Sequence, residues 1–220
     1  MPTVGVILSG CGFLDGAEIH ESVLTLLALD QRGAKAVCCA PKGEFDVVDH
    51  TTHKPAGEKR SILRESARIC RGDIRDVAAV KAGELDALLL PGGFGAAKNL
   101  CNFASAGADC AVQPDVEKLV GDMLTARKPV GAICIAPALL ARIAGKRGIH
   151  ATVTIGSDAG TAAAIEKTGC THQACKVTDF VVDAEHRLVT TPAYMLGPGP
   201  AAVFEGIRGL VDRVLAMCGR

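Results

Sequence analysis

Aromatic residues are scarce in this chain of 220 residues: they make up 3% of it, tryptophan is absent and tyrosine occurs once. This scarcity argues against base-stacking platforms for nucleic acid and against aromatic sugar-binding surfaces. Net charge is absent too, because lysine plus arginine and aspartate plus glutamate each number 24 and are interspersed along the chain. We therefore expect neither nucleic acid nor an anionic membrane surface as a partner.

Long apolar runs, a secretion signal and metal-binding spacings are missing as well. No apolar run approaches the roughly 18 residues that a membrane span needs, and residues 1–10 lack the basic region and cleavage site of a signal peptide. Ten cysteines are present, but they form neither a CxxC pair nor a zinc-type cluster with histidine. We expect a cytoplasmic protein without a metal, whose thiols are free and mostly buried.

Apolar segments typical of buried strands alternate with helical segments over most of the chain. This alternation predicts one α/β domain, residues 1–220, built on a doubly wound, mostly parallel sheet with helices on both faces. The polar residues 43–60 are interpreted as a surface excursion. The expected strands are 3–8, 34–40, 86–90, 129–133 and 152–155, with a hairpin at 177–182 and 187–190, and the expected helices are 18–31, 62–70, 115–126, 135–143, 161–168 and 201–217.

Cys134 is the strongest candidate for a chemical role. A buried strand runs directly into it and a helix follows at once, which is the setting of a nucleophile on a tight, strained turn at the sheet edge. The positive end of that helix should lower the pKa of the thiol below its ordinary value. The N–H of Ile135 would then face a negative oxygen forming on a carbon bonded to the sulfur.

Two further segments end at the same predicted edge. Pro91-Gly-Gly follows a core strand, so its backbone can approach a ligand closely, and the Gly93 N–H is a candidate second oxyanion donor. Glu18 and Glu21 begin a helix, where carboxylates are ordinary partners of the helix dipole. Glu21, however, faces the apolar side of that helix, where partial desolvation would raise its pKa and suit it to move protons.

Nucleotide-binding and triad patterns are not met. The first loop has glycines at 10, 12 and 16, one residue too long for GxGxxG, and a Walker pattern is absent. A hydrolytic cysteine also requires a nearby histidine. His20 should point away from Glu21 around its helix, and His50, His53, His172 and His186 lie in polar stretches that we interpret as solvated surface.

Five segments carry a resemblance to a known family. The chain resembles the class I glutamine-amidotransferase-like (PfpI-type) superfamily nearly end to end, and within it the bacterial ElbB branch, named for enhancing lycopene biosynthesis and described as a glyoxalase. The segments are Gly5-Val-Ile-Leu-Ser-Gly-Cys-Gly12, Glu18-Ile-His-Glu21, Pro91-Gly-Gly-Phe-Gly-Ala-Ala-Lys-Asn-Leu100, Cys134-Ile-Ala-Pro137 and Val189-Thr-Thr-Pro-Ala-Tyr-Met195.

The resemblance implies a flavodoxin-like fold, a homodimer and no cofactor. It places the nucleophile on Cys134, its carboxylic partner on Glu21 and the oxyanion donors on Gly93 and Ile135. The implied reaction converts the small dicarbonyl glyoxal to glycolate, which can reflect repair of glycated protein groups (deglycase activity). A link to isoprenoid synthesis is implied by the branch name alone.

The chain departs from the superfamily in its histidines. Amidotransferases carry a late His-x-Glu, but the corresponding stretch here is Thr190-Thr-Pro-Ala-Tyr194, and Ile155-Gly156 stands where some members place a histidine after the nucleophile. Ammonia release from glutamine is therefore not expected. Three alternatives stay open: a thiol-based redox or stress sensor, a cysteine peptidase, and an accessory protein of isoprenoid metabolism without turnover.

Overall fold

The structure is a computed structural model that describes residues 1–197 and 199–219. Its centre is a seven-stranded sheet in the order β10-β11-β7-β6-β1-β2-β5, in which β10 alone runs antiparallel to its neighbour. This confirms the predicted mostly parallel α/β sheet. The strands are β1 (Thr3–Ile7), β2 (Lys35–Ala40), β5 (Arg75–Asp76), β6 (Ala87–Leu90), β7 (Val130–Ile133), β10 (Val181–Asp183) and β11 (Leu188–Thr191).

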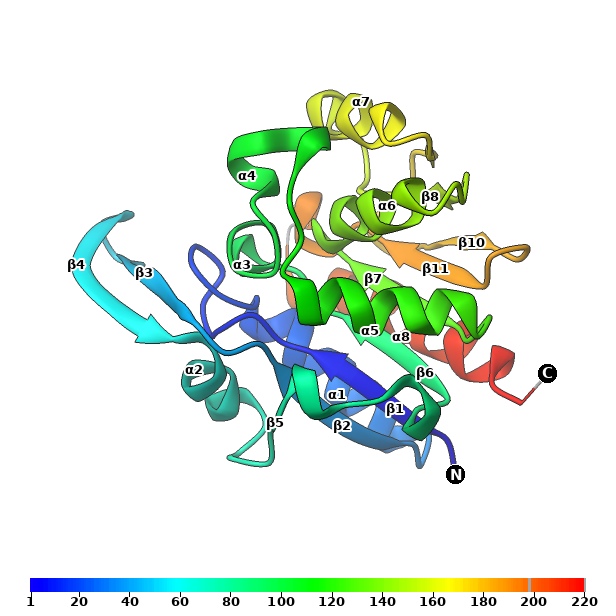
Figure 1. Cartoon of the computed structure of the whole chain (residues 1–220), viewed down its shortest axis with the longest axis horizontal. Coiled ribbons are helices and arrows are strands. Elements are labelled where there is room, and N and C mark those ends of the chain that lie inside the picture. The colour runs from blue at the N-terminus through cyan, green and yellow to red at the C-terminus, as the bar shows by residue number, and fades with distance from the viewer. Residues whose placement is uncertain (198, 220) are drawn as a thin grey trace.

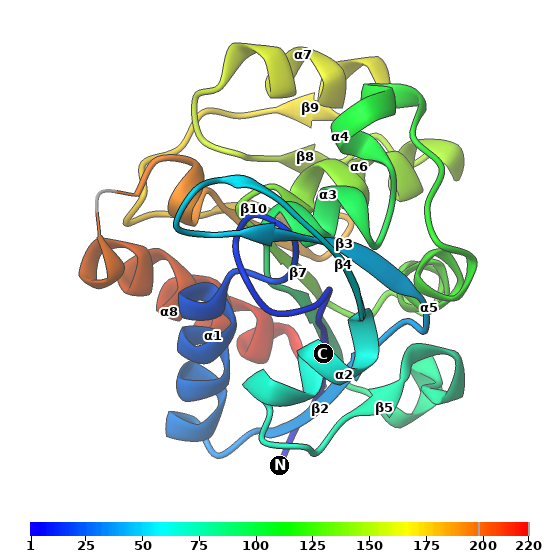
Figure 2. The same ribbon diagram turned by 90° about the vertical axis from the view of Figure 1, so that its left-hand side faces the viewer.

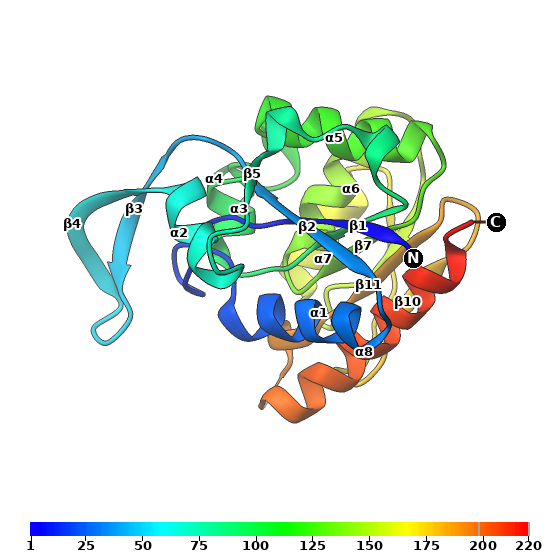
Figure 3. The same cartoon turned by 90° about the horizontal axis from the view of Figure 1, so that it is seen from below.

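Helices cover both faces of this sheet, as Figure 3 shows, with α1 and α8 on one side and α5 and α6 on the other. Strands β6, β7 and β11 are buried at every position because both of their faces are covered. In β1, Val4 and Val6 pack in the same cluster as Leu29 of α1, whereas Ile7 packs in the cluster that contains Leu140 of α6. The helices are α1 (Ile19–Gln31), α2 (Ile62–Ile69), α3 (Phe94–Lys98), α4 (Phe103–Ala106), α5 (Pro114–Thr125), α6 (Ala136–Lys146), α7 (Ala159–Lys167) and α8 (Pro200–Met217).

The polar segment that was predicted as a surface excursion is an antiparallel hairpin, β3 (Glu44–Asp49) and β4 (Lys54–Ser61). It extends from the body of the molecule at the left of Figure 1. Phe45 and Val47 of β3 are buried and pack against Ile62 at the start of α2. Only alternate side chains of β3 are buried, which is why the segment has so few apolar residues.

Another predicted strand, residues 152–155, lies outside the main sheet. Strand β8 (Thr152–Val153) pairs instead with β9 (Thr171–His172), next to α7 at the top of Figure 2. The backbone N–H of Thr154 donates to the Thr190 side chain at 2.9 Å. This segment is therefore linked to β11 by a side-chain hydrogen bond and not by backbone pairing between strands. Among the described helices, none is long and apolar enough to cross a bilayer.

Candidate active site

Four neighbouring strands deliver the candidate residues to one edge of the sheet. Their order is β11-β7-β6-β1, all parallel, so their carboxyl ends lie together. Cys134 follows β7, Gly93 follows β6, and Glu21 lies in the first turn of α1 after β1. The structure therefore brings together the residues that the sequence selected, and it adds Tyr194, which follows β11 in a 3-10 turn (Ala193–Met195).

Cys134 lies on a strained turn, as its sequence setting predicts. Its φ is 63°, a left-handed conformation that is uncommon for residues other than glycine. Helix α6 begins two residues later, with Ile135 as its N-cap. The side chain is 7% exposed and is one of the residues that line a pocket. The strained backbone of Cys134 thus lies at a strand-to-helix turn, the position from which a nucleophile projects in folds of this type.

Glu21 is fully buried beside this cysteine. Its Oε2 accepts a hydrogen bond from the Gly92 N–H at 3.0 Å, and its Oε1 accepts one from the Tyr194 N–H at 3.2 Å. Burial, followed by the nearby Glu18 carboxylate, raises the pKa of Glu21 to about 8, although these hydrogen bonds oppose the rise. The prediction of a desolvated carboxyl with a raised pKa is confirmed.

The predicted acidic thiol is wrong. The pKa of Cys134 lies well above its ordinary value, because burial disfavours the thiolate and the Glu21 carboxylate repels it. Hydrogen bonds from the Gly93 and Ile135 N–H groups favour the thiolate but do not outweigh these two causes.

The backbone N–H groups of Gly93 and Ile135, which were predicted as oxyanion donors, both lie next to Cys134. The N–H groups of Gly93 and Ile135 are directed at the Cys134 sulfur from the starts of α3 and α6. Gly93 has a φ of 88°, and a Cβ there would come within 2.4 Å of the Glu18 nitrogen and 2.5 Å of the Gly16 oxygen. Only glycine fits this position, which holds one donor toward the sulfur.

The pocket at Cys134 has a volume of about 340 Å³. It holds two carboxylates and, among its described lining residues, no lysine, arginine or histidine. Its walls are otherwise mostly apolar. The lining residues are Phe13, Glu18, Gly93, Phe94, Cys134, Ile135, Asp158, Thr161, Tyr194 and Met195.

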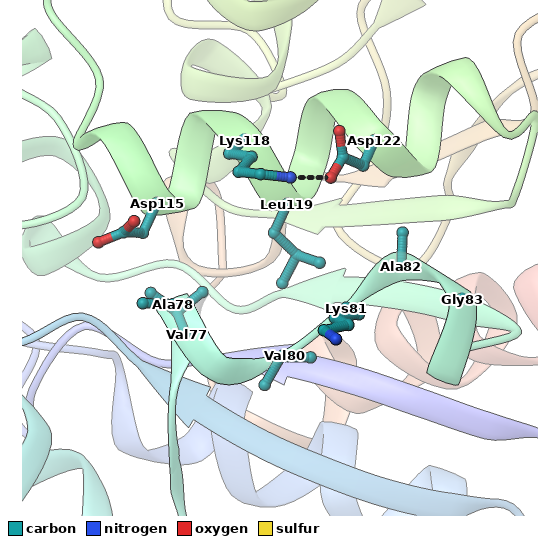
Figure 4. Close-up of a pocket in the computed structure, with 10 residues that line it drawn as sticks. All are labelled: Val77, Ala78, Val80, Lys81, Ala82, Gly83, Asp115, Lys118, Leu119 and Asp122. Carbon is teal, nitrogen blue, oxygen red and sulfur yellow. Dashed lines mark hydrogen bonds and ion pairs between the residues drawn. The ribbon is translucent and has the colours of Figure 1, made fainter.

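A second pocket, of about 370 Å³, lies between α5 and the 3-10 turns that precede β6 (Figure 4). It shares no lining residue with the pocket at Cys134. Its ionic side chains include Lys118 and Asp122, which pair with each other at 2.6 Å. Cysteine, serine and histidine are missing from its described lining, so we place the active site at Cys134. The described residues contain no group of three or more His, Cys, Asp or Glu that could hold a metal ion.

Three site residues were missed or undervalued from the sequence. Glu18 does cap α1, accepting a hydrogen bond from the Glu21 N–H at 2.6 Å, but it also lines the pocket, and burial raises its pKa. Tyr194 lines the pocket and is hydrogen-bonded to the exposed His20, a contact that the sequence analysis did not predict. The only signal for Tyr194 was its place in a family segment, which gave it no role.

The β3–β4 hairpin supports the loop that carries Phe13. Asp15 of this loop is buried, and its Oδ2 accepts a hydrogen bond from the Val48 N–H of β3 at 2.8 Å. The Leu14 N–H donates to Nε2 of His50 at 3.3 Å, and the His50 ring packs edge-on against Phe13. The hairpin thus fixes one wall of the pocket, which gives residues 43–60 a positioning role.

Gly92 lies where Cys134 and Glu21 meet, and it provides a test of this geometry. A Cβ at position 92 would come within 2.4 Å of the Cys134 Cβ and 2.8 Å of the Glu21 Oε2. Gly92→Ala is therefore expected to lower the free energy of unfolding by about 1–3 kcal/mol and to slow alkylation of Cys134. Denaturant unfolding and peptide mass spectrometry measure the two effects. Unchanged stability and unchanged alkylation would contradict the close packing around Gly92.

Comparison with known proteins agrees with the resemblance. The sequence model of the DJ-1/PfpI family matches residues 15–193. A human protein, glutamine amidotransferase-like class 1 domain-containing protein 3, mitochondrial, is 42% identical over 99% of this chain and 84% of its own. A solved isoprenoid biosynthesis protein with an amidotransferase-like domain from Ehrlichia chaffeensis is 35% identical, with a TM-score of 0.91 over 97% of this chain and 99% of its own. Glyoxalase III from Candida albicans shares the fold, with 14% identity and a TM-score of 0.66 over 99% and 97% of the two chains.

The names of the curated relatives overturn one expectation. The human, rat and zebrafish proteins, which are 42%, 41% and 30% identical to this chain, are all named mitochondrial. The cytoplasmic location expected from the sequence is therefore corrected, because the names of these relatives point to mitochondria. The fold, the elbow at Cys134 and the match over residues 15–193 lead to one conclusion: the chain belongs to the DJ-1/PfpI family.

Proposed function

We propose that this protein is a cofactor-independent glyoxalase that converts glyoxal to glycolate through a covalent adduct on Cys134. The observation that carries the proposal is the pairing of the Cys134 thiol with the buried Glu21 carboxyl, beneath two N–H donors, in a pocket of about 340 Å³. A nucleophile, a proton carrier and an oxyanion site are the three parts that an internal oxidation and reduction of a dicarbonyl requires.

The first step adds the thiol to one aldehyde carbon. Ionised Glu21 takes the proton of the thiol as the sulfur bonds to the carbon, and the carbonyl oxygen becomes an oxyanion between the Gly93 and Ile135 N–H groups. Glu21 then returns this proton to the oxyanion, which gives a neutral hemithioacetal. Addition to an aldehyde is reversible and has no leaving group, so a histidine is not required to protonate one.

The second step moves hydrogen between the two carbons. Glu21 removes the proton from the carbon that bears sulfur, and the electron pair forms a double bond to the neighbouring carbon, which gives an enediolate with its negative charge on the oxygen of that second carbon. Glu21 delivers the proton to that second carbon, the hydroxyl on the first carbon loses its proton to solvent, and the oxygen of the second carbon takes up one proton, leaving a thioester of glycolate. Water cleaves the thioester and restores the thiol, so one carbon is oxidised, the other is reduced and no external oxidant is consumed.

The charge of the pocket favours an uncharged substrate. Glu18 and Asp158 line it, and no cationic side chain of the described lining opposes them. A carboxylate or a phosphate bound there would lie in a negative field without a partner. Glyoxal carries no charge and is small enough to reach Cys134 past Phe13 and Phe94, which line the same pocket and are 42% and 48% exposed.

Glycolate formation from ¹³C-labelled glyoxal, followed by NMR, tests the proposal. The purified protein is expected to form glycolate at a rate proportional to its concentration, and a chelator should not change this rate. Ammonia release from glutamine, measured alongside, should stay at background because no histidine of the described residues is hydrogen-bonded to the Cys134 sulfur. If glycolate does not form, the proposed function is wrong. A robust release of ammonia would instead favour an amidotransferase.

A further inference from the structure

Tyr194 lines the pocket and pairs with His20, which lies outside the pocket lining, and the two steps above use neither side chain. The Nδ1 of His20 lies 2.7 Å from the phenolic oxygen of Tyr194, at hydrogen-bond distance. The two rings lie 5.8 Å apart between centroids. Tyr194 lines the pocket, whereas His20 is exposed on α1. The pair therefore connects the pocket to solvent.

Tyr194 also joins this pair to the catalytic carboxyl. Its backbone N–H donates to Oε1 of Glu21 at 3.2 Å, so one residue orients Glu21 through its main chain and contributes a phenol to the pocket through its side chain. Burial raises the pKa of Tyr194, and the Glu18 and Glu21 carboxylates raise it further. At neutral pH the phenol thus holds its proton and is suited to donate it, not to accept one.

The enediol step has a demand that Glu21 alone does not meet. When the proton leaves the first carbon, negative charge develops on the oxygen of the second carbon. Gly93 and Ile135 are already engaged with the oxygen of the first carbon. A proton donor on another side of the pocket would neutralise the second oxygen as the charge forms.

We propose that Tyr194 is the catalytic acid for the second carbonyl oxygen and that His20 positions and reprotonates it. This inference rests on the proposed glyoxalase function. Tyr194 gives its phenolic proton to the second oxygen as the carbon–hydrogen bond breaks toward Glu21. The phenolate recovers a proton from His20, which takes one from solvent, and the proton later lost from the first hydroxyl returns to solvent.

The test compares Tyr194→Phe with the wild-type protein, using glyoxal as the substrate. The variant keeps the ring and the backbone N–H that holds Glu21, and it loses only the hydroxyl. Glycolate formation is expected to fall by about 10²-fold, as for the loss of a general acid. Alkylation of Cys134 by iodoacetamide, read on its own peptide, should keep its wild-type rate, because the first step does not use the phenol.

His20→Ala tests the positioning role on the exposed side of the molecule. Its glycolate rate is expected to fall by about tenfold or more, and added imidazole should restore part of it, because the exposed site leaves room for a free imidazole that can carry the proton to Tyr194. Tyr194→Phe should not respond to imidazole. His150→Ala is the matched control, since the ring of that exposed histidine contacts the Gly169 oxygen at 2.8 Å and lies outside the pocket lining.

The outcomes separate this inference from the function on which it rests. If the wild-type protein forms no glycolate, both the glyoxalase function and the role of Tyr194 are wrong. A wild-type protein that forms glycolate, together with a Tyr194→Phe variant of equal rate, overturns the role of Tyr194 and leaves the glyoxalase function standing. Loss of activity in His20→Ala without rescue by imidazole, accompanied by slower alkylation of Cys134, would mean that His20 is only structural.

Discussion

The Cys134→Ala variant is expected to form glycolate from glyoxal no faster than the uncatalysed background. The proposed reaction requires a sulfur–carbon bond at the position where Glu21 and the two N–H donors converge. Alanine has the same Cβ as cysteine, so the left-handed turn at position 134 is retained and the fold should persist. Cys134→Ser should lose at least about 10³-fold, because a hydroxyl without an adjacent strong base is a poor nucleophile.

The measurement must follow the product and not the loss of glyoxal. The chain has nine other cysteines, and any accessible thiol can form a hemithioacetal with glyoxal without converting it. Loss of glyoxal would then continue in Cys134→Ala, while glycolate would not form. Cys175→Ala, which removes a partly exposed thiol distant in sequence from the elbow, is the matched control and should keep the wild-type rate. Glycolate formation above one tenth of the wild-type rate in Cys134→Ala would place the chemistry on another residue.

Much of the fold could be predicted from the sequence, because the patterns that indicate its strands and helices are local along the chain. The core strands are continuous apolar runs, and each helix on the sheet has its own start and end signals. The edge at which Cys134, Gly93 and Glu21 meet follows from parallel strands ending on the same side. The hairpin β3–β4 was missed as a pair of strands because β4 has no buried residue and therefore shows no apolar pattern.

The electrostatics of the site could not be predicted in the same way. A helix start after Cys134 can be identified in the sequence, but the burial of its thiol and the approach of Glu21 depend on elements far apart in the chain. The predicted direction of the pKa shift of Cys134 was wrong for that reason. The contact of His20 with Tyr194 joins residues 174 positions apart and has no sequence signal. The expected homodimer stays a prediction.

The rate of glycolate formation should rise with pH through the titration of Glu21. Its pKa is about 8, so the carboxylate that must accept a proton is a minor species at pH 7, roughly one tenth of the total. In kcat/KM, which reports the free enzyme, the rise should have its midpoint near pH 8 and level off above it. A rate that falls between pH 7 and pH 9 would contradict a role for Glu21 as a base.

Glu21→Gln is expected to lower glycolate formation by at least about 10²-fold and to remove this rise with pH, because an amide cannot accept the proton. The amide oxygen can still accept from Gly92 or Tyr194, but one N–H loses its partner, and the free energy of unfolding should fall by about 1–3 kcal/mol. Glu65→Gln, which alters a glutamate of α2 that is 8% exposed, is the matched control for stability and should keep the wild-type activity.

The same Glu21→Gln substitution should make Cys134 more reactive toward iodoacetamide. Removing the carboxylate removes one of the two main causes that raise the pKa of the thiol, so more thiolate is present at each pH above neutrality. Disorder would also speed alkylation, because it would expose the buried thiol. The comparison is therefore made on a Glu21→Gln variant that keeps a single cooperative unfolding transition in denaturant, and in that variant we expect faster alkylation together with slower turnover. That combination would assign to Glu21 the movement of protons and not the activation of sulfur. If Glu21→Gln forms glycolate at the wild-type rate, Glu21 is only a buried carboxyl that caps two N–H groups, and the proton carrier lies elsewhere in the pocket.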